Sequence, residues 1–335
     1  MLHGLALVIA LSLGSSTATA LGGGGAFCSR TAQLQLHACK AELGDDYLSA
    51  SAICLNVTDR GERAECFHEV WIEAAEQRGL CREQLQARRD LCALVGEGRY
   101  DPDFDPDDFE SDFTNLQNPN AYFPLPIGGK WAYATEGETN VVTVRDATKN
   151  VEGVTCIVVN DLVIGEESSE DTDDWYAQAK NGDAWYCGEQ AKDFELFEGD
   201  EPQEPELVSI DGSFKHGRDG DRAGGIFLRD PTVGTTYRQE VSLGNAEDAA
   251  TILSTSYGYG EDDELDELVP QELAEQYCPN SDCIVTSDFT PIEPGVFERK
   301  YYSPGVGVFL ETKPEDEEIN VLVGCNVDPK CSPLP

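Results

Sequence analysis

The chain has 335 residues, and its 64 acidic against 23 basic side chains leave a formal net charge of -41. A surface field of this sign repels nucleic acid and anionic membrane surfaces, so we exclude both as partners. Cations or a basic protein surface fit the charge better, although an acidic surface can also serve solubility alone. The length allows two domains, each with a core of its own.

The first twenty residues are typical of a signal peptide. An apolar run from Leu5 to Leu13 precedes the small residues Ala18-Thr19-Ala20, which form a cleavage site. We therefore predict a secreted or periplasmic protein after cleavage near Ala20. All twelve cysteines follow this point, which indicates an oxidising compartment and allows six disulfides.

Residues 28–96 are rich in Ala, Glu, Gln, Arg and Leu and predict a disulfide-stapled helical bundle. Six cysteines recur at intervals of 11, 15, 12, 15 and 11, a palindrome, and positions 11 apart share one helix face. Gly44 and Gly79 are interpreted as breaks, and Asp59 as an N-cap. The predicted helices are 29–43, 46–55, 60–78 and 81–95.

The spacing of these six cysteines narrows their pairing without fixing it. Antiparallel helices joined by a turn at Gly79 favour Cys66–Cys92, with Cys28–Cys54 as the mirrored pair and Cys39–Cys81 remaining. A nested alternative stays open, in which 28 pairs with 92, 39 with 81 and 54 with 66. Both schemes contain Cys39–Cys81.

Residues 97–120 form an acidic linker rich in Pro and Asp, and this linker is a candidate calcium site. Its carboxylates alternate as the ligands of a calcium loop do, and a further Asp stands at the twelfth position. Pro106 occupies the position where such a loop needs Gly for its sharp turn. The alternative is a Pro-stiffened linker without a metal. No motif requires a cofactor, and the candidate calcium ligands are Asp101, Asp103, Asp105, Asp107 and Asp112.

From residue 121 to 331 the hydrophobic pattern has period two, which predicts an antiparallel β domain. One helix is expected at 270–277, within an acidic insertion at about 261–282. The chain is therefore α+β, with a C-terminal, mostly antiparallel curved β-sheet or half-barrel. Strands are predicted at 130–133, 140–145, 154–160, 235–241, 250–255, 283–287, 296–302, 306–311 and 319–323.

The stretch from Asp174 to Glu189 predicts a hairpin closed by a type I′ turn at Asn181-Gly182. In that register Trp175 and Tyr186 share one face, and Tyr176 and Trp185 share the other. Large rings on both faces suit either a binding groove or core packing. The candidate ligand-binding residues are Trp131, Trp175, Tyr176, Trp185 and Tyr186.

No catalytic motif is present, and we assign no catalytic residue. His216 lies in a Gly-rich turn, where a solvated loop histidine is expected more often than a general base. Arg238, Glu240 and the pair Glu247-Asp248 predict a polar cluster that either binds a ligand or fastens strands, and we favour fastening.

The ordered landmarks of the β domain resemble a recurrent, functionally uncharacterised β-rich domain of secreted bacterial proteins, over about residues 118–312. Pro304 to Gly307 also resembles, more loosely, part of the lipoprotein-carrier half-barrels. The landmarks are Tyr122 to Tyr133, Asp174 to Glu189, Gly212 to Phe214 with Asp219-Gly220, Tyr237 to Glu240 with Ala246 to Ala249, Thr290 to Gly295 and Lys300 to Gly307.

The resemblance implies a bridge between Cys156 and Cys283. A simple meander agrees with this pairing, since it would leave Cys156 and Cys187 on strands separated by a third strand, about 9–10 Å apart. Cys325 and Cys331 can close a short loop, and Cys187 then remains for Cys278.

Together these patterns predict a non-catalytic binding or envelope-associated module. One alternative is a carrier that holds a small apolar ligand inside a half-barrel. A second is a secreted hydrolase that uses paired carboxylates, which are common in so acidic a chain.

Overall fold

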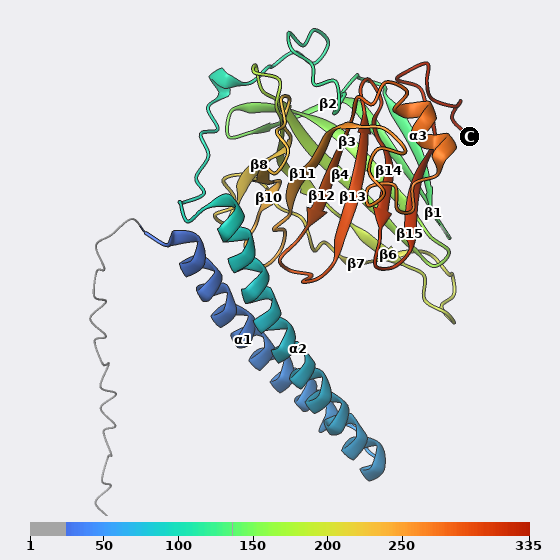
Figure 1. Ribbon diagram of the computed structural model, residues 1–335. Coiled ribbons are helices and arrows are strands. Elements are labelled where there is room, and N and C mark those ends of the chain that lie inside the picture. The colour runs from blue at the N-terminus through green and yellow to red at the C-terminus, as the bar shows by residue number, and fades with distance from the viewer. Residues whose placement is uncertain (1–24, 136) are drawn as a thin grey trace, which may run out of the picture.

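The structure is a computed structural model that describes residues 25–135 and 137–335 (Figure 1). A helical hairpin precedes a large antiparallel sheet, so the predicted α+β layout of two parts is confirmed. The predicted signal peptide lies outside the described residues.

The N-terminal part has two long helices, α1 (Phe27–Cys54) and α2 (Arg60–Val95), and the prediction of four shorter helices is wrong. Gly44 and Gly79 lie inside the helices, because a glycine weakens an exposed helix by only about 1 kcal/mol relative to Ala. Asp59 caps α2 as predicted, and its carboxylate accepts hydrogen bonds from Gly61 N and Glu62 N at 2.7 and 3.0 Å.

The hairpin has the nested set of disulfides, Cys28–Cys92, Cys39–Cys81 and Cys54–Cys66. The prediction of Cys39–Cys81 is therefore confirmed, whereas Cys66–Cys92 and Cys28–Cys54 are wrong. The reason is the position of the turn. Because both helices are continuous, the chain reverses after Cys54 and not at Gly79, so cysteines equidistant from residue 60 face each other.

The hairpin depends on these bridges, since apart from cysteines the buried apolar residues of its two helices are Ala32, Leu36, Val70, Ala74 and Leu91. We expect the double replacement of Cys39 and Cys81 by Ser to lower the free energy of unfolding of the hairpin by about 2–5 kcal/mol. Thermal melts followed by far-ultraviolet circular dichroism measure this loss. The same change at Cys325 and Cys331 is the control, and equal helical melts for the two variants would contradict the expectation.

The sheet contains fifteen strands within the described residues, and its neighbouring strands pair in antiparallel fashion. The predicted strands are present, except that the single strand predicted at 235–241 is divided at Gln239 into β9 and β10, which pair with different strands. β6, β7 and β8 were not predicted. The strands are β1 (Lys130–Thr135), β2 (Glu138–Val151), β3 (Val154–Ile164), β4 (Ser168–Gln178), β5 (Ala184–Gln190), β6 (Asp193–Glu195), β7 (Glu206–Ser209), β8 (Arg222–Phe227), β9 (Thr236–Arg238), β10 (Glu240–Val241), β11 (Ala249–Tyr257), β12 (Cys283–Phe289), β13 (Phe297–Ser303), β14 (Gly307–Lys313) and β15 (Glu318–Cys325).

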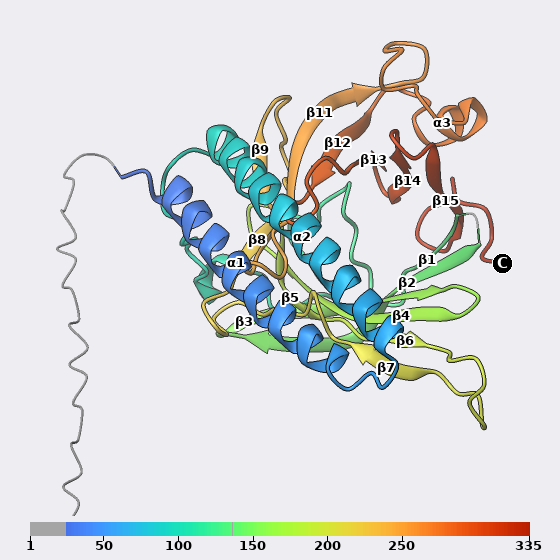
Figure 2. The same ribbon diagram turned by 90° about the horizontal axis from the view of Figure 1, so that it is seen from below.

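The sheet curls into a nearly closed barrel, as the view along it shows (Figure 2). Its strand order is β10-β8-β5-β4-β3-β2-β1-β15-β14-β13-β12-β11-β9, with β6 and β7 added beside β4. The two edge strands, β9 and β10, are separated in sequence by Gln239 alone, so the two edges meet there. A Cβ atom on Gly224 of β8 would lie 2.2 Å from the Gln239 carbonyl oxygen, so this approach requires glycine.

The β4–β5 hairpin differs by one residue from the predicted register. Tyr176 pairs with Tyr186 and Ala177 with Trp185, because the loop has three residues that end on Gly182 at φ +99°. A change of register by one residue exchanges the faces. Tyr176 and Tyr186 therefore share a face, and the prediction that Trp175 and Tyr186 share a face is wrong.

The β domain contains the disulfides Cys156–Cys187, Cys278–Cys283 and Cys325–Cys331. Only the last was predicted, and Cys156–Cys283 and Cys187–Cys278 are wrong. Cys187 is the extra residue of a bulge, since Trp175 pairs with Gly188 and Tyr176 with Tyr186. With this bulge in a curved sheet, the Cα atoms of Cys156 and Cys187 lie 6.7 Å apart although β4 runs between their strands.

The acidic linker packs on the outside of the barrel. Phe104 and Phe109 are buried in one cluster with Trp175, and Trp185 packs against that cluster. A short 3₁₀ turn at Pro106–Asp108 places Phe109, whose ring centroid lies 5.9 Å from that of Trp185. The linker therefore packs over this face of the hairpin, where Trp175 is buried and Trp185 is half-buried.

The acidic insertion covers the outer face of β12 to β14. Its helix α3 (Gln271–Tyr277) confirms the predicted helix, and the Tyr277 ring stacks on Phe309 at 5.0 Å. The Tyr301 hydroxyl donates to Leu265 O at 2.6 Å. The insertion thus lies against the wall of the barrel.

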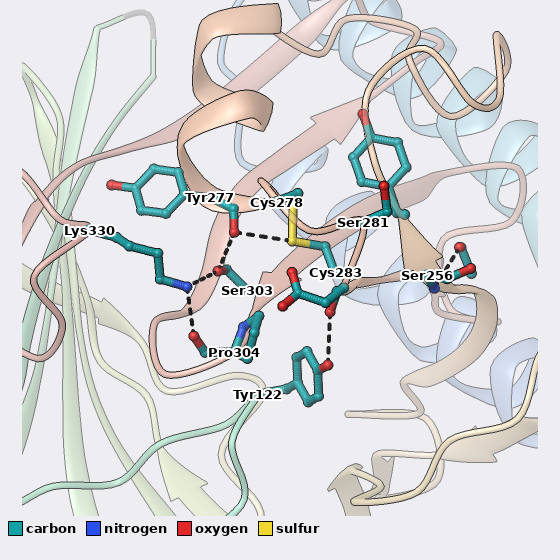
Figure 3. Close-up of a disulfide and its surroundings, with 12 residues drawn as sticks. Tyr122, Ser256, Tyr277, Cys278, Ser281, Cys283, Ser303, Pro304 and Lys330 are labelled. Carbon is teal, nitrogen blue, oxygen red and sulfur yellow. Dashed lines mark hydrogen bonds between the residues drawn. A yellow bond between two sulfur atoms is a disulfide. The ribbon is translucent and has the colours of Figure 1, made fainter.

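Hydrogen bonds surround the Cys278–Cys283 disulfide at one end of the barrel (Figure 3). Ser303 Oγ donates to Tyr277 O at 2.6 Å, and Lys330 Nζ donates to Ser303 Oγ and Pro304 O at 2.7 and 2.8 Å. The Tyr122 hydroxyl donates to Asp282 O at 2.8 Å. These bonds join α3, the β13–β14 turn, the C-terminal tail and the segment before β1.

Candidate ligand cavity

A cavity of about 200 Å³ lies inside the barrel. Alternate residues of each strand face it, as the pleat of a strand requires. Its apolar wall includes Trp131 and Tyr133 of β1, Tyr176 of β4 and Tyr302 of β13. The indole Nε1 of Trp131 donates to Val306 O at 2.7 Å and the Tyr133 hydroxyl to Val308 O at 3.0 Å, which fixes both rings.

The end of the barrel opposite the Cys278–Cys283 disulfide is formed by the ends of β1 and β14 and the starts of β2 and β15. A second hollow of about 130 Å³ is lined there by Thr135, Glu138, Lys313 and Glu318, among others. The two hollows share Asn140, Glu311 and Asn320. They are therefore neighbours in the barrel interior, and we call the second hollow the mouth and the first the inner chamber.

Carboxylates outnumber ammonium groups on this inner surface by seven to two. The basic residues are Lys300 in the chamber and Lys313 at the mouth. The acidic residues are Glu138, Asp161, Asp174, Asp288, Glu298, Glu311 and Glu318.

Both lysines are already paired. Lys300 Nζ lies 3.8, 3.7 and 3.6 Å from oxygens of Asp288, Glu298 and Glu311. Burial lowers the pKa of Lys300, but these carboxylates outweigh burial and raise its pKa well above the ordinary value. Lys313 Nζ lies 3.5 Å from Glu298 and 3.6 Å from Glu318.

Asp161 of β3 and Asp174 of β4 lie on the opposite wall, and no basic side chain of the described residues lies within 4.0 Å of either. Burial raises the pKa of Asp161 to about 7, and nearby Asp174 and Glu311 raise it further. Burial and the neighbouring Glu189 raise the pKa of Asp174 to about 8. Desolvation of an unpaired carboxyl group acts in this direction.

Asp174 and Glu189 face each other across β4 and β5 and share a partner. The Tyr186 hydroxyl hydrogen-bonds to Asp174 Oδ1 and, at 2.7 Å, to Glu189 Oε2. Burial raises the pKa of Glu189 to about 7, and it raises the pKa of Glu240 well above the ordinary value. This part of the barrel interior therefore contains several carboxyl groups without a countercharge.

Two oxygens of the cavity wall have no hydrogen-bond partner within the described part of the chain. They are Oδ1 of Asp161 and Oδ1 of Asn140, and both atoms are shielded from solvent. Val142 pairs with Asp161 across β2 and β3, which places Asn140 diagonally beside Asp161 on the inner face. Both unpaired atoms are hydrogen-bond acceptors.

The structure divides the five predicted ligand-binding residues between the two faces of the wall. Trp131 and Tyr176 line the cavity, and Tyr186 stacks on Tyr176 with ring centroids 4.8 Å apart. Trp175 and Trp185 lie outside, beneath the linker. The sequence did not reveal the inner carboxylates, although strand parity places Asp161 and Asp174 on the face of Tyr176 once the register is known.

The candidate calcium ligands serve separate local contacts. Asp101 pairs with Arg222 at 3.0 Å, Asp105 caps the 3₁₀ turn through Asp107 N, and Asp112 accepts from Thr114 N at 2.9 Å. Residues 25–135 and 137–335 contain no group of three or more His, Cys, Asp or Glu side chains arranged for a metal ion. Calcium binding by the linker stays a prediction.

Glu247 and Arg238 of the predicted polar cluster make separate contacts in the structure. Glu247 fastens the helical hairpin to the barrel through Arg88 of α2, with Nε at 2.8 Å and Nη2 at 2.7 Å from its carboxylate oxygens. Arg238 lies over the Tyr100 ring at 5.8 Å. His216 Nδ1 accepts from Ala223 N at 2.9 Å, which is a structural contact.

No helix in the described part of the chain is long and apolar enough to cross a membrane. Comparison with protein-family models, with curated proteins and with solved structures found no match to this chain.

Proposed function

We propose that this protein is an exported, non-catalytic binding module that holds a small organic molecule inside its barrel. The observation that carries the proposal is the cavity inside the barrel, lined by aromatic rings and by polar groups. Ligand sites usually combine an apolar wall with a few polar groups that orient the ligand. The six disulfides fit an oxidising compartment outside the cytoplasm.

The dimensions of the cavity limit the ligand. A volume of about 200 Å³ lies below the ~300–1,000 Å³ of sites for drug-sized molecules, so the ligand is small. The carboxyl groups of the wall distinguish the site from that of a carrier of purely apolar molecules, since burying them beside hydrocarbon would leave them without partners.

Three matched probes test the proposal: benzylamine, benzyl alcohol and benzoate, measured by isothermal titration calorimetry. We expect saturable binding of at least one probe with one site per chain. Val142→Phe places a ring in the cavity and is expected to abolish binding. Val141→Phe, the neighbour on the other face of β2, is the matched control and should bind as the parent protein does.

Two outcomes would contradict the proposal. The first is the absence of binding for all three probes. The second is binding that persists unchanged in Val142→Phe, which would place the probe outside the barrel.

A further inference from the structure

We infer that the ligand of the barrel cavity is a small organic cation, an amine or amidine with an apolar body. This inference rests on the proposed function and names the class of molecule that the same cavity takes. Its basis is the distribution of charge and of unpaired hydrogen-bonding atoms over the cavity wall.

The two walls of the cavity differ in charge. On the β13 and β14 side, Lys300 is surrounded by three carboxylates, so its charge is already compensated and does not attract an anionic ligand. On the β3 and β4 side, Asp161 and Asp174 line the same space without a basic partner in the described residues. Asp174 is only 7 % exposed, so solvent does not replace the missing countercharge.

The unpaired hydrogen-bonding atoms of the cavity wall also favour a cationic ligand. Oδ1 of Asp161 and Oδ1 of Asn140 are shielded from solvent and have no donor in their present orientation, although the Asn140 side chain lies close enough to lower the pKa of Asp161. An anion would need unpaired donors instead. An Asn140 amide turned by 180° would donate one hydrogen bond to Asp161. That turn would add no positive charge, so the two carboxyl groups of this wall would still lack a countercharge.

The apolar half of the ligand has a defined place. Tyr176 of β4 lies two residues beyond Asp174 on the same inner face, and Val142 and Val159 line the same chamber. A cationic nitrogen between Asp161 and Asp174 would therefore extend its hydrocarbon body along Tyr176. A cation close to an aromatic face gains further electrostatic stabilisation.

A charge-matched comparison of two variants on one strand tests the inference. For the parent protein we expect benzylamine to bind at least tenfold more tightly than benzyl alcohol, and benzoate to bind more weakly than either. Asp174→Asn removes one carboxylate at nearly constant volume, and we expect it to weaken benzylamine binding at least tenfold while leaving benzyl alcohol within threefold. Asp173→Asn is the matched control, since Asp173 lies on the outer face beside Arg145.

The outcomes separate the inference from the proposed function. Tighter binding of benzyl alcohol or benzoate than of benzylamine would overturn the inference and leave the binding function standing. Equal losses of benzylamine affinity in Asp174→Asn and Asp173→Asn would also overturn it. No binding of any probe would overturn both. Because burial raises the pKa of Asp174 to about 8, this carboxyl is largely protonated near neutral pH. The variant, with a neutral side chain of similar size, should therefore fold at least as well as the parent protein.

Discussion

Replacement of Arg88 by Ala is expected to lower the free energy of unfolding by about 3–5 kcal/mol. Arg88 and Glu247 are almost fully buried, with side-chain exposures of 6 % and 2 %, and they connect α2 to the loop before β11. Without the guanidinium, Glu247 would keep one hydrogen bond, from Gly244 N at 2.7 Å, and its buried charge would be uncompensated. Denaturant titration followed by circular dichroism measures the difference.

Arg89→Ala provides the control for this experiment. Arg89 is exposed and makes one long contact, 3.3 Å from Nη2 to Gln33 Oε1, so its loss should change stability by less than about 0.5 kcal/mol. The double variant Arg88→Ala with Glu247→Gln should recover part of the loss, since it removes the uncompensated charge. Indistinguishable stabilities of Arg88→Ala and Arg89→Ala would show that this ion pair does not fasten the hairpin.

The second large effect is a loss of stability as the pH rises. The pKa of Asp161 is raised from 3.8 to about 7 and that of Asp174 from 3.8 to about 8, chiefly by burial. At pH values between the ordinary pKa and the raised pKa of these groups, the folded protein binds more protons than the unfolded chain. The free energy of unfolding therefore falls with increasing pH. The loss begins above about pH 4 and is complete about one pH unit above the folded pKa of Asp174, which is about 8. A tenfold change in a proton-binding constant corresponds to about 1.4 kcal/mol.

Thermal melts at several pH values between about 5 and 8.5 measure how stability depends on pH. Variants then show which carboxyl groups cause the dependence. Asp161→Asn and Asp174→Asn should each flatten the curve, and each should be more stable than the parent protein by about 2–4 kcal/mol near the upper limit. Asp173→Asn should keep the full slope, because Asp173 pairs with Arg145 on the outer face. Parallel curves for Asp173→Asn and Asp174→Asn would refute the assignment to the cavity.

The groups that face these two carboxyls come from several elements and titrate with them. Glu170, Tyr176, Tyr186, Glu189 and Glu240 influence Asp174 or its partners, and Glu311 of β14 faces Asp161. A single substitution therefore changes the titration of its neighbours as well. The comparison of slopes between inner and outer variants does not depend on assigning a pKa to one residue.

The sequence was sufficient for the strands whose alternation is long and regular, such as β3, β12 and β14. It failed where one residue decides the geometry. The loop that ends on Gly182 could have two residues or three, and this choice alone decided whether Tyr186 shares a face with Trp175 or with Tyr176. The extra residue Cys187 has no signal in the local pattern, and the bridge to Cys156 depends on it.

The cavity was harder to predict than the sheet, because its residues come from strands far apart in sequence. Asp161, Asp174, Lys300 and Glu311 meet only when the sheet curls and β9 and β10 join its edges. In a chain with 64 acidic side chains, no single carboxylate stands out by composition. The helices were predicted in type but not in length. Continuing each helix through Gly44 or Gly79 costs little free energy, and the three disulfides of the hairpin stabilise the continuous helices.

The nested order of the hairpin bridges gives the protein a simple route for oxidative folding. Cys54 and Cys66 are 12 residues apart, so their bridge closes a short loop and loses little chain entropy. Once that bridge exists, Cys39 and Cys81 are each 15 residues from it along the chain, although 42 residues separate them in sequence. Cys28 and Cys92 then lie 11 residues beyond the second bridge. Bridges added outward from the tip would each bring together cysteines that the preceding bridge already holds close, and the palindromic spacing keeps the two arms in register.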